Sequence, residues 1–284
     1  MRGRTSLPAD ARMGQQRSEC TDEAQAGPRM TAELQAPVRS LGSWTIGLIG
    51  IVGLIAIIAG VYASPEALVA VGILIAAGVG IGWPHFLRIP AKKTLAAVIA
   101  LPGAAAAVAA GVTPAPGYLD WTPALVAVGM MAVFVVQLIR GTGQAQRLES
   151  TLGCCAGVLL SCLGAGWIAG ARFNGVREML LVAAVSAAVA LLAGLIRWPD
   201  SIIAPLGIVL AGLAGPLAGL VLSDIAVLPA AVFGVVVGAV LASFRRLATL
   251  RGAPLNIPAA LSMGLAPVSA VGSLAYFIDK LLIY

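Results

Sequence analysis

The single histidine of the chain is the side chain best suited to acid–base chemistry, and its surroundings favour a packing role. His85 lies between Trp83 and Arg88, next to Phe86, at the end of a long apolar run. Histidine titrates near neutral pH and is the most frequent general base in enzymes. The acidic residues near the apolar runs are isolated from one another, as helix caps or turn residues are. We therefore interpret His85 as a packing residue at a membrane interface.

The other reactive residue types form no catalytic or metal-binding pattern. The sequence contains no HExxH, GxSxG or P-loop pattern and no aspartate pair able to hold Mg²⁺ against a pyrophosphate. Cys154, Cys155 and Cys162 lie within one apolar run, where small apolar packing residues are expected rather than a disulfide or a metal site. We predict that the protein is not an enzyme and that it holds neither a metal nor a cofactor.

Two proline–glycine pairs are the remaining features that could form a site. Pro102-Gly103 lies in the middle of one apolar run, and Gly215-Pro216 lies towards the middle of another. Proline frees a backbone carbonyl, and interrupted helices at corresponding positions of two halves point to the central site of a transporter. Pro102, Gly103, Gly215 and Pro216 are therefore the predicted substrate-binding residues. The alternative is that each proline only kinks a packed helix.

The chain that must position these residues is strongly apolar. Of its 284 residues, 60% are hydrophobic and 11% are charged, whereas about 25% are charged in a soluble domain. The apolar residues fall in blocks of about twenty, a length that crosses ~30 Å of hydrocarbon as a helix. The sequence predicts an all-α fold, a polytopic helical integral membrane protein with about nine transmembrane helices. The approximate spans are 44–62, 67–86, 94–112, 121–139, 151–170, 179–196, 202–222, 225–243 and 258–278.

The polar start of the chain differs from the rest. Residues 1–40 show no apolar periodicity and no signal-peptide run, so we expect a disordered cytoplasmic tail followed by a transmembrane domain, residues 41–284. Met1, Met13 and Met30 are alternative translation starts.

A recurring pattern predicts that the transmembrane domain contains two similar halves. A Trp-Pro pair and two further prolines recur at a constant offset of 115 residues, which is typical of an internal repeat. The matching positions are Trp83-Pro84 and Trp198-Pro199, Pro90 and Pro205, and Pro114 and Pro229. We predict a 4+4+1 arrangement of parallel halves, residues 41–140 and 150–251, followed by an extra helix at 257–279.

The basic residues predict an orientation. The net charge of +6 is spread over short loops, which argues against nucleic-acid binding. With a cytoplasmic N-terminus, nine lysines and arginines lie inside and three lie outside, in agreement with the positive-inside rule. The nine are Arg88, Lys92, Lys93, Arg140, Arg147, Arg197, Arg245, Arg246 and Arg251; the three are Arg172, Arg177 and Lys280. Together with the arginine- and alanine-rich composition, this favours a bacterial cytoplasmic membrane, with the N-terminus inside and the C-terminus outside.

The absence of charge from the predicted spans bears on function. No charged residue falls in the middle of a span, where charges usually mark ion pathways or proton relays. We therefore expect a small transporter or permease for an uncharged or lipidic substrate, with the lipid bilayer as its surroundings. The alternatives are a non-catalytic scaffold or assembly subunit of an envelope complex, bound to a membrane protein or to a second copy of the chain, and a lipid-modifying enzyme.

Overall fold

The computed structural model describes residues 43–89, 92–139, 147–173, 177–196, 200–222, 227–250 and 256–282. All of its helices belong to one unit, residues 40–284. The predicted tail, residues 1–40, lies outside the described residues. The helices are α2 (Ser43–Ala63), α3 (Pro65–Phe86), α4 (Lys92–Val112), α5 (Thr122–Ile139), α6 (Arg147–Leu163), α7 (Ala165–Arg172), α8 (Glu178–Leu195), α9 (Asp200–Leu222), α10 (Val227–Leu250) and α11 (Ile257–Leu282).

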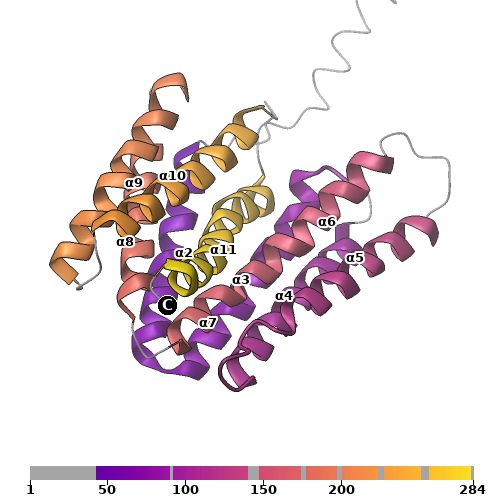
Figure 1. The fold of residues 1–284 in the computed structure, drawn as a ribbon. Coiled ribbons are helices and arrows are strands. Elements are labelled where there is room, and N and C mark those ends of the chain that lie inside the picture. The colour runs from indigo at the N-terminus through magenta and orange to yellow at the C-terminus, as the bar shows by residue number, and fades with distance from the viewer. Residues whose placement is uncertain are drawn as a thin grey trace, which may run out of the picture. The chain divides into compact units, whose positions relative to one another are not determined.

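The expected helical architecture is confirmed within the described residues, which contain no strand (Figure 1). They include nine spans that are long and apolar enough to cross a membrane. Eight spans are single helices, and the remaining one, Leu148–Arg172, comprises α6 and α7. A helix satisfies the backbone polar groups of an apolar run within the run itself, and this explains why such sequences fold as long helices.

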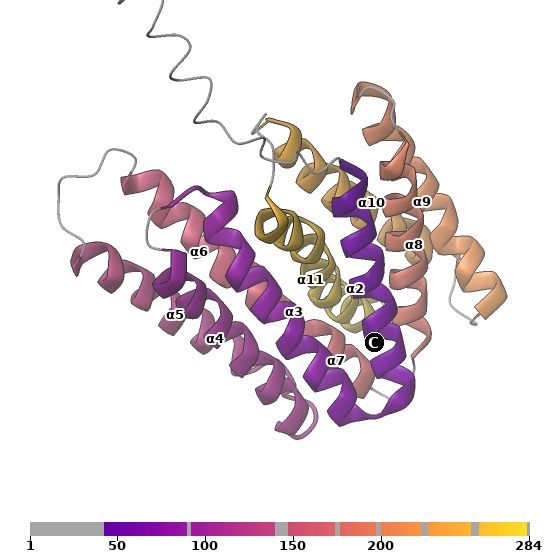
Figure 2. The same ribbon diagram turned by 180° about the vertical axis from the view of Figure 1, so that it is seen from behind.

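α11 lies at the centre of the helix packing. It contacts α2, α3, α6, α7, α8 and α10, and most of its residues are buried, whereas most residues of the peripheral α5 are not. α3 to α7 lie on one side of α2 and α11, and α8 to α10 lie on the other (Figures 1 and 2). The alanines, glycines and serines of α11 allow neighbouring helices to approach closely.

This packing does not separate the two predicted repeat halves. α6 and α7, which begin the predicted second half, pack against α3 and α4, and α6 also packs against α5. α8, α9 and α10 pack mainly on one another. The repeat therefore stays a prediction from the sequence.

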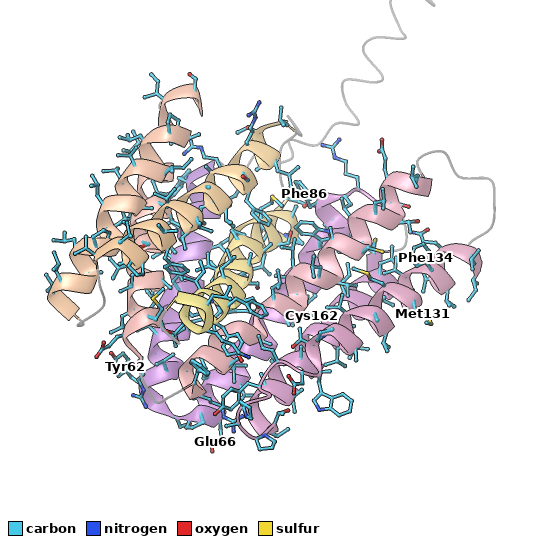
Figure 3. The ribbon with its side chains drawn as sticks, viewed as in Figure 1. Tyr62, Glu66, Phe86, Met131, Phe134 and Cys162 are labelled. Carbon is cyan, nitrogen blue, oxygen red and sulfur yellow. The ribbon has the colours of Figure 1, made fainter. Side chains whose placement is uncertain are left out.

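Contacts between helix ends show how the spans alternate in direction. Arg245 near the end of α10 bonds to Gly194 near the end of α8, and the starts of α2 and α11 meet in the same region. At the opposite end, Arg172 at the end of α7 bonds to Ala110 near the end of α4. We call these the Arg245 end and the Arg172 end. In Figure 3, Phe86 lies towards the first and Tyr62 towards the second.

The fifth span is the one that the structure divides. α6 ends at Leu163 and α7 begins at Ala165, with Gly164 between them. The amide of Trp167 donates to the carbonyl of Gly164 at 3.3 Å. The carbonyl of Leu163 accepts a hydrogen bond of 2.7 Å from the hydroxyl of Ser273 on α11. The neighbouring helix thus satisfies a carbonyl at the break.

The interruptions that we expected at Pro102 and Pro216 are not breaks. α4 runs through Pro102 and α9 runs through Pro216. A proline removes a single N–H from the helix, and the tight packing of both helices against their neighbours holds the remaining turns together.

The end of α10 also differs from the sequence prediction. The span was expected to end near residue 243, with Arg245 and Arg246 in a loop, but the helix continues to Leu250. Residues 244–250 contain neither glycine nor proline and are mostly good helix formers. Both arginines therefore lie on the helix, just before its last turn.

Candidate functional site

Pro102 and Gly103 lie where α4 meets α5 and α6. A Cβ added at Gly129 of α5 would lie 2.8 Å from Cγ of Pro102. Gly103 is buried, and a Cβ there would overlap the hydroxyl of Ser161 on α6. The missing side chain of Gly103 is therefore what lets α6 approach α4. This pair forms a helix-packing point.

Gly215 and Pro216 lie where α9 meets α8 and α10. A Cβ at Gly215 would overlap the carbonyl of Ala230 on α10 and would lie 3.4 Å from Oγ of Ser186 on α8. The Ser186 hydroxyl is fully buried and has no hydrogen-bond partner among the described residues. Because Pro216 lacks an N–H, the carbonyl of Gly212 lacks its usual intrahelical donor. This contact therefore contains a buried hydroxyl and lies one turn from a carbonyl without its usual helix donor.

The structure does not bring the two pairs together. α4 packs on α3, α5, α6 and α7, whereas α9 packs on α8 and α10. α2, α3 and α11 lie between α4 and α9 (Figures 1 and 2). The assignment of Pro102, Gly103, Gly215 and Pro216 to substrate binding stays a prediction.

A cavity of about 260 Å³ lies instead at the Arg245 end. It is formed by the N-terminal parts of α2, α9 and α11 and by the C-terminal parts of α8 and α10. Its walls are mainly apolar and include Ile46, Leu191, Ile203, Leu241 and Met263. Ligand pockets are typically about 300–1,000 Å³, apolar, and equipped with a few polar groups. This cavity is large enough for a small ligand or for part of a longer one.

Arg245 is the only charged residue lining this cavity within the described part of the chain. Its Nη1 donates a hydrogen bond of 2.6 Å to the carbonyl of Gly194, in the last turn of α8. Carbonyls at a helix C-terminus lack intrahelical donors and carry partial negative charge, so they stabilise a guanidinium. The contact holds the arginine side chain at the cavity wall.

Two backbone features shape the other walls. A Cβ added at Gly207 of α9 would have no heavy atom within 4 Å, so a larger side chain there would extend into open space. On α11, Pro267 lacks an N–H, so the carbonyl of Met263 lacks its usual intrahelical donor. Gly207, Met263 and Pro267 all line the cavity. The cavity wall therefore includes Met263, whose carbonyl lacks its usual intrahelical hydrogen bond, as well as the guanidinium of Arg245.

His85 and the three cysteines of α6 lie away from the cavity. Nδ1 of His85 lies 2.9 Å from the carbonyl of Ile81, one turn earlier on α3. Cys154 and Cys162 are fully buried in the core, and Cys155 is partly buried. These positions agree with the packing roles that we inferred from the sequence.

Sequence reasoning missed the cavity residues. The available signal was helical spacing, because Gly238, Leu241 and Arg245 share one face once α10 is continued past residue 243. Nothing in the sequence distinguishes Gly207 from the other glycines of the spans. Comparison of the chain with protein-family models, with curated proteins and with solved structures found no match.

Proposed function

We propose that the chain is a multi-pass protein of a bacterial cytoplasmic membrane that moves a lipidic substrate by way of the cavity at the Arg245 end. The membrane part of the proposal is supported by the outer surface of the helices. Val52, Leu74, Met131, Leu217 and Leu228 are 64–75% exposed and come from five different spans. Met131 and Phe134 project outward from α5 in Figure 3. Exposed apolar area costs about 25 cal/mol per Å² in water, and lipid removes that cost.

The cavity is the observation that carries the transport part of the proposal. Five helices line the cavity, and α9 forms one of its walls. Among the described helices, α9 packs to an appreciable extent only on α8 and α10. The outer face of α9 exposes Ile202, Val209 and Leu213. A single helix therefore lies between the cavity and the apolar surroundings. Pro205 removes one intrahelical hydrogen bond beside the cavity and Gly207 has no side chain there, so a local opening at this turn of α9 is a direct route for an apolar molecule.

The charges at the two ends support an orientation. Arg88, Lys92, Lys93 and Arg246 accompany Arg245, whereas Arg172, Arg177 and Lys280 belong to the opposite end. By the positive-inside rule, the Arg245 end is cytoplasmic. The cavity then lies at the depth of the inner leaflet, from which a lipidic substrate would enter.

Reconstitution into liposomes tests this function. A lipid with a fluorescent head group is quenched by an added reductant only in the outer leaflet, so the loss of protected signal reports movement between leaflets. We expect the protein to accelerate this loss over protein-free liposomes. Gly207→Met should reduce the rate about tenfold, because a Cβ at this cavity-lining position meets no heavy atom within 4 Å and the longer side chain would fill part of the cavity.

Val209→Met is the matched control on the same helix, since Val209 is exposed on the outer face. It should transport as the wild type does. Equal rates for Gly207→Met and wild type, or a wild-type rate no higher than that of protein-free liposomes, would contradict the proposal.

A further inference from the structure

We infer that the cavity takes part of one alkyl chain of its lipidic ligand and leaves the head group outside, so that the chain determines binding and the charge of the head group does not. This inference rests on the proposed function, because it states which part of a lipidic molecule the cavity holds.

The polar side chains of the cavity wall are engaged with the backbone of the protein. Within the described residues, these side chains are Arg245 and Thr249. Nη1 of Arg245 donates to the carbonyl of Gly194 at 2.6 Å, and the hydroxyl of Thr249 donates to the carbonyl of Arg246 at 2.9 Å. The other lining residues are apolar residues and glycines. The wall is therefore suited to hydrocarbon.

The charge of Arg245 is stabilised by the helix end that it contacts. Gly194 lies in the last turn of α8, where backbone carbonyls carry partial negative charge. A charged head group that entered apolar surroundings would lose its hydration, and only a partner placed for it would offset that cost. The guanidinium instead joins α10 to α8. We therefore assign Arg245 the role of a positioning residue that holds the cavity wall.

The volume of the cavity corresponds to part of one chain. A cavity of roughly 150 Å³ holds one benzene molecule, so this cavity of about 260 Å³ holds about ten carbon atoms. Two chains side by side, or the fused rings of a sterol, need more space than this. A chain of sixteen carbons fits in part, and its remaining carbons keep the head group at a distance from the wall.

The cavity extends inward from the helix ends. Gly238 lines it and lies seven residues before Arg245 on α10. At 1.5 Å per helical residue, the cavity reaches about 10 Å further from the helix end than Arg245 does. In the orientation proposed above, the chain of an inner-leaflet lipid points the same way. Its far end then lies deep in the cavity, and its head group stays at the interface.

Direct binding to the purified full-length protein in detergent tests the inference. The probe is tritiated 1-hexadecanol, and the competitors are palmitate and hexadecyltrimethylammonium, which have the same chain length and opposite charges. We expect a single saturable site and, at equal mole fraction in the micelle, affinities for both ions within about threefold of that for hexadecanol. Cholesterol should bind about tenfold more weakly than hexadecanol, because its rings overfill the cavity.

Variants of α9 separate the cavity from uptake by the detergent micelle. Gly207→Met fills part of the cavity and should weaken the binding of all three chain probes about tenfold. Val209→Met changes the exposed face of the same helix and should bind as the wild type does. Gly207→Ala adds a smaller side chain and should give a smaller loss, which decides the matter if Gly207→Met does not fold. Thermal unfolding is recorded for each variant.

Variants of the two polar side chains test whether they read the head group. Arg245→Gln removes the contact with Gly194 and should weaken the binding of all three chain probes alike, and Arg245→Lys should recover part of this loss. Thr249→Val removes a hydroxyl at nearly constant size and should change none of the affinities. The ratio of palmitate affinity to hexadecanol affinity should stay the same in all three variants. If Arg245→Gln does not fold, the ratio in Arg245→Lys decides.

Different outcomes overturn the inference and the proposed function. A preference of more than about threefold for either ion, a change of that ratio in a folded Arg245 variant, or tighter binding of cholesterol than of hexadecanol would overturn the inference. Loss of binding in Gly207→Met would still support the cavity as the site. Wild-type binding of every probe by Gly207→Met and Gly207→Ala would overturn the cavity, and the proposed function with it. Saturable chain binding without faster lipid movement in the liposome assay would overturn the proposed function alone.

Discussion

The hydroxyl of Ser273 donates a hydrogen bond of 2.7 Å to the carbonyl of Leu163, across the seam between α11 and the break that follows α6. One turn earlier on α11, the hydroxyl of Ser269 is also buried but has no hydrogen-bond partner among the described residues. Two serines on one helix thus differ in whether they satisfy a neighbouring backbone group.

This difference predicts opposite effects of two alanine substitutions. Ser273→Ala leaves the buried carbonyl of Leu163 without its partner and should lower the free energy of unfolding by about 1–2 kcal/mol. Ser269→Ala removes a polar atom that has no partner and should be neutral or slightly stabilising. Thermal unfolding in detergent, followed by tryptophan fluorescence, compares them. Equal losses in the two variants would show that the hydrogen bond does not distinguish them.

Arg172 predicts a larger loss at the opposite end. Its Nη1 donates to the carbonyls of Ala110 and Thr113 at 2.7 and 2.9 Å, and its guanidinium lies 4.9 Å from the ring centroid of Tyr118. Arg172→Gln should therefore lower the free energy of unfolding by about 2–3 kcal/mol. Arg177→Gln is the control, because Arg177 is exposed and its guanidinium lies 5.6 Å from the ring centroid of Tyr62. A loss for Arg177→Gln as large as that for Arg172→Gln would contradict this account.

The orientation of the spans can be tested with single cysteines in a chain whose four native cysteines are replaced by alanine. Glu149 is exposed at the start of α6, and Asp120 is exposed before α5. Glu149→Cys should react with a membrane-impermeant maleimide only after the cells are opened, and Asp120→Cys should react in intact cells. Reaction of Glu149→Cys and protection of Asp120→Cys in intact cells would reverse the orientation, and the same accessibility for both would refute the alternation of spans.

The number and type of the spans could be predicted because the signal is local. A run of about twenty apolar residues forms a long helix whichever helices surround it. Helix ends were less certain, as the continuation of α10 past residue 243 shows. There the charges of Arg245 and Arg246 suggested a loop, although the residue types around them favour a helix.

The packing and the cavity could not be predicted because they depend on distant residues. The break at Gly164 is accompanied by a hydrogen bond between Ser273 and Leu163, which are 110 residues apart. The contact of Arg245 with Gly194 joins residues 51 positions apart, and the cavity beside it needs five helices. A single sequence has no periodicity that reports such pairings. The two proline–glycine pairs could be identified from the sequence because proline and glycine affect the backbone of their own helix, without any contribution from distant residues.

The two prolines now provide a test between the site predicted from the sequence and the cavity. The sequence hypothesis predicts that Pro102→Ala and Pro216→Ala reduce transport alike, because they occupy corresponding positions of two halves. If the cavity is the site, neither substitution should reduce transport strongly. Neither residue lines it, and both lie in helices that continue through them. We therefore expect both variants to transport within about twofold of the wild type in the liposome assay. Gly207→Met, assayed at the same protein density, should retain about a tenth of the rate. An equal loss in both proline variants, at normal stability, would favour the site of the sequence hypothesis.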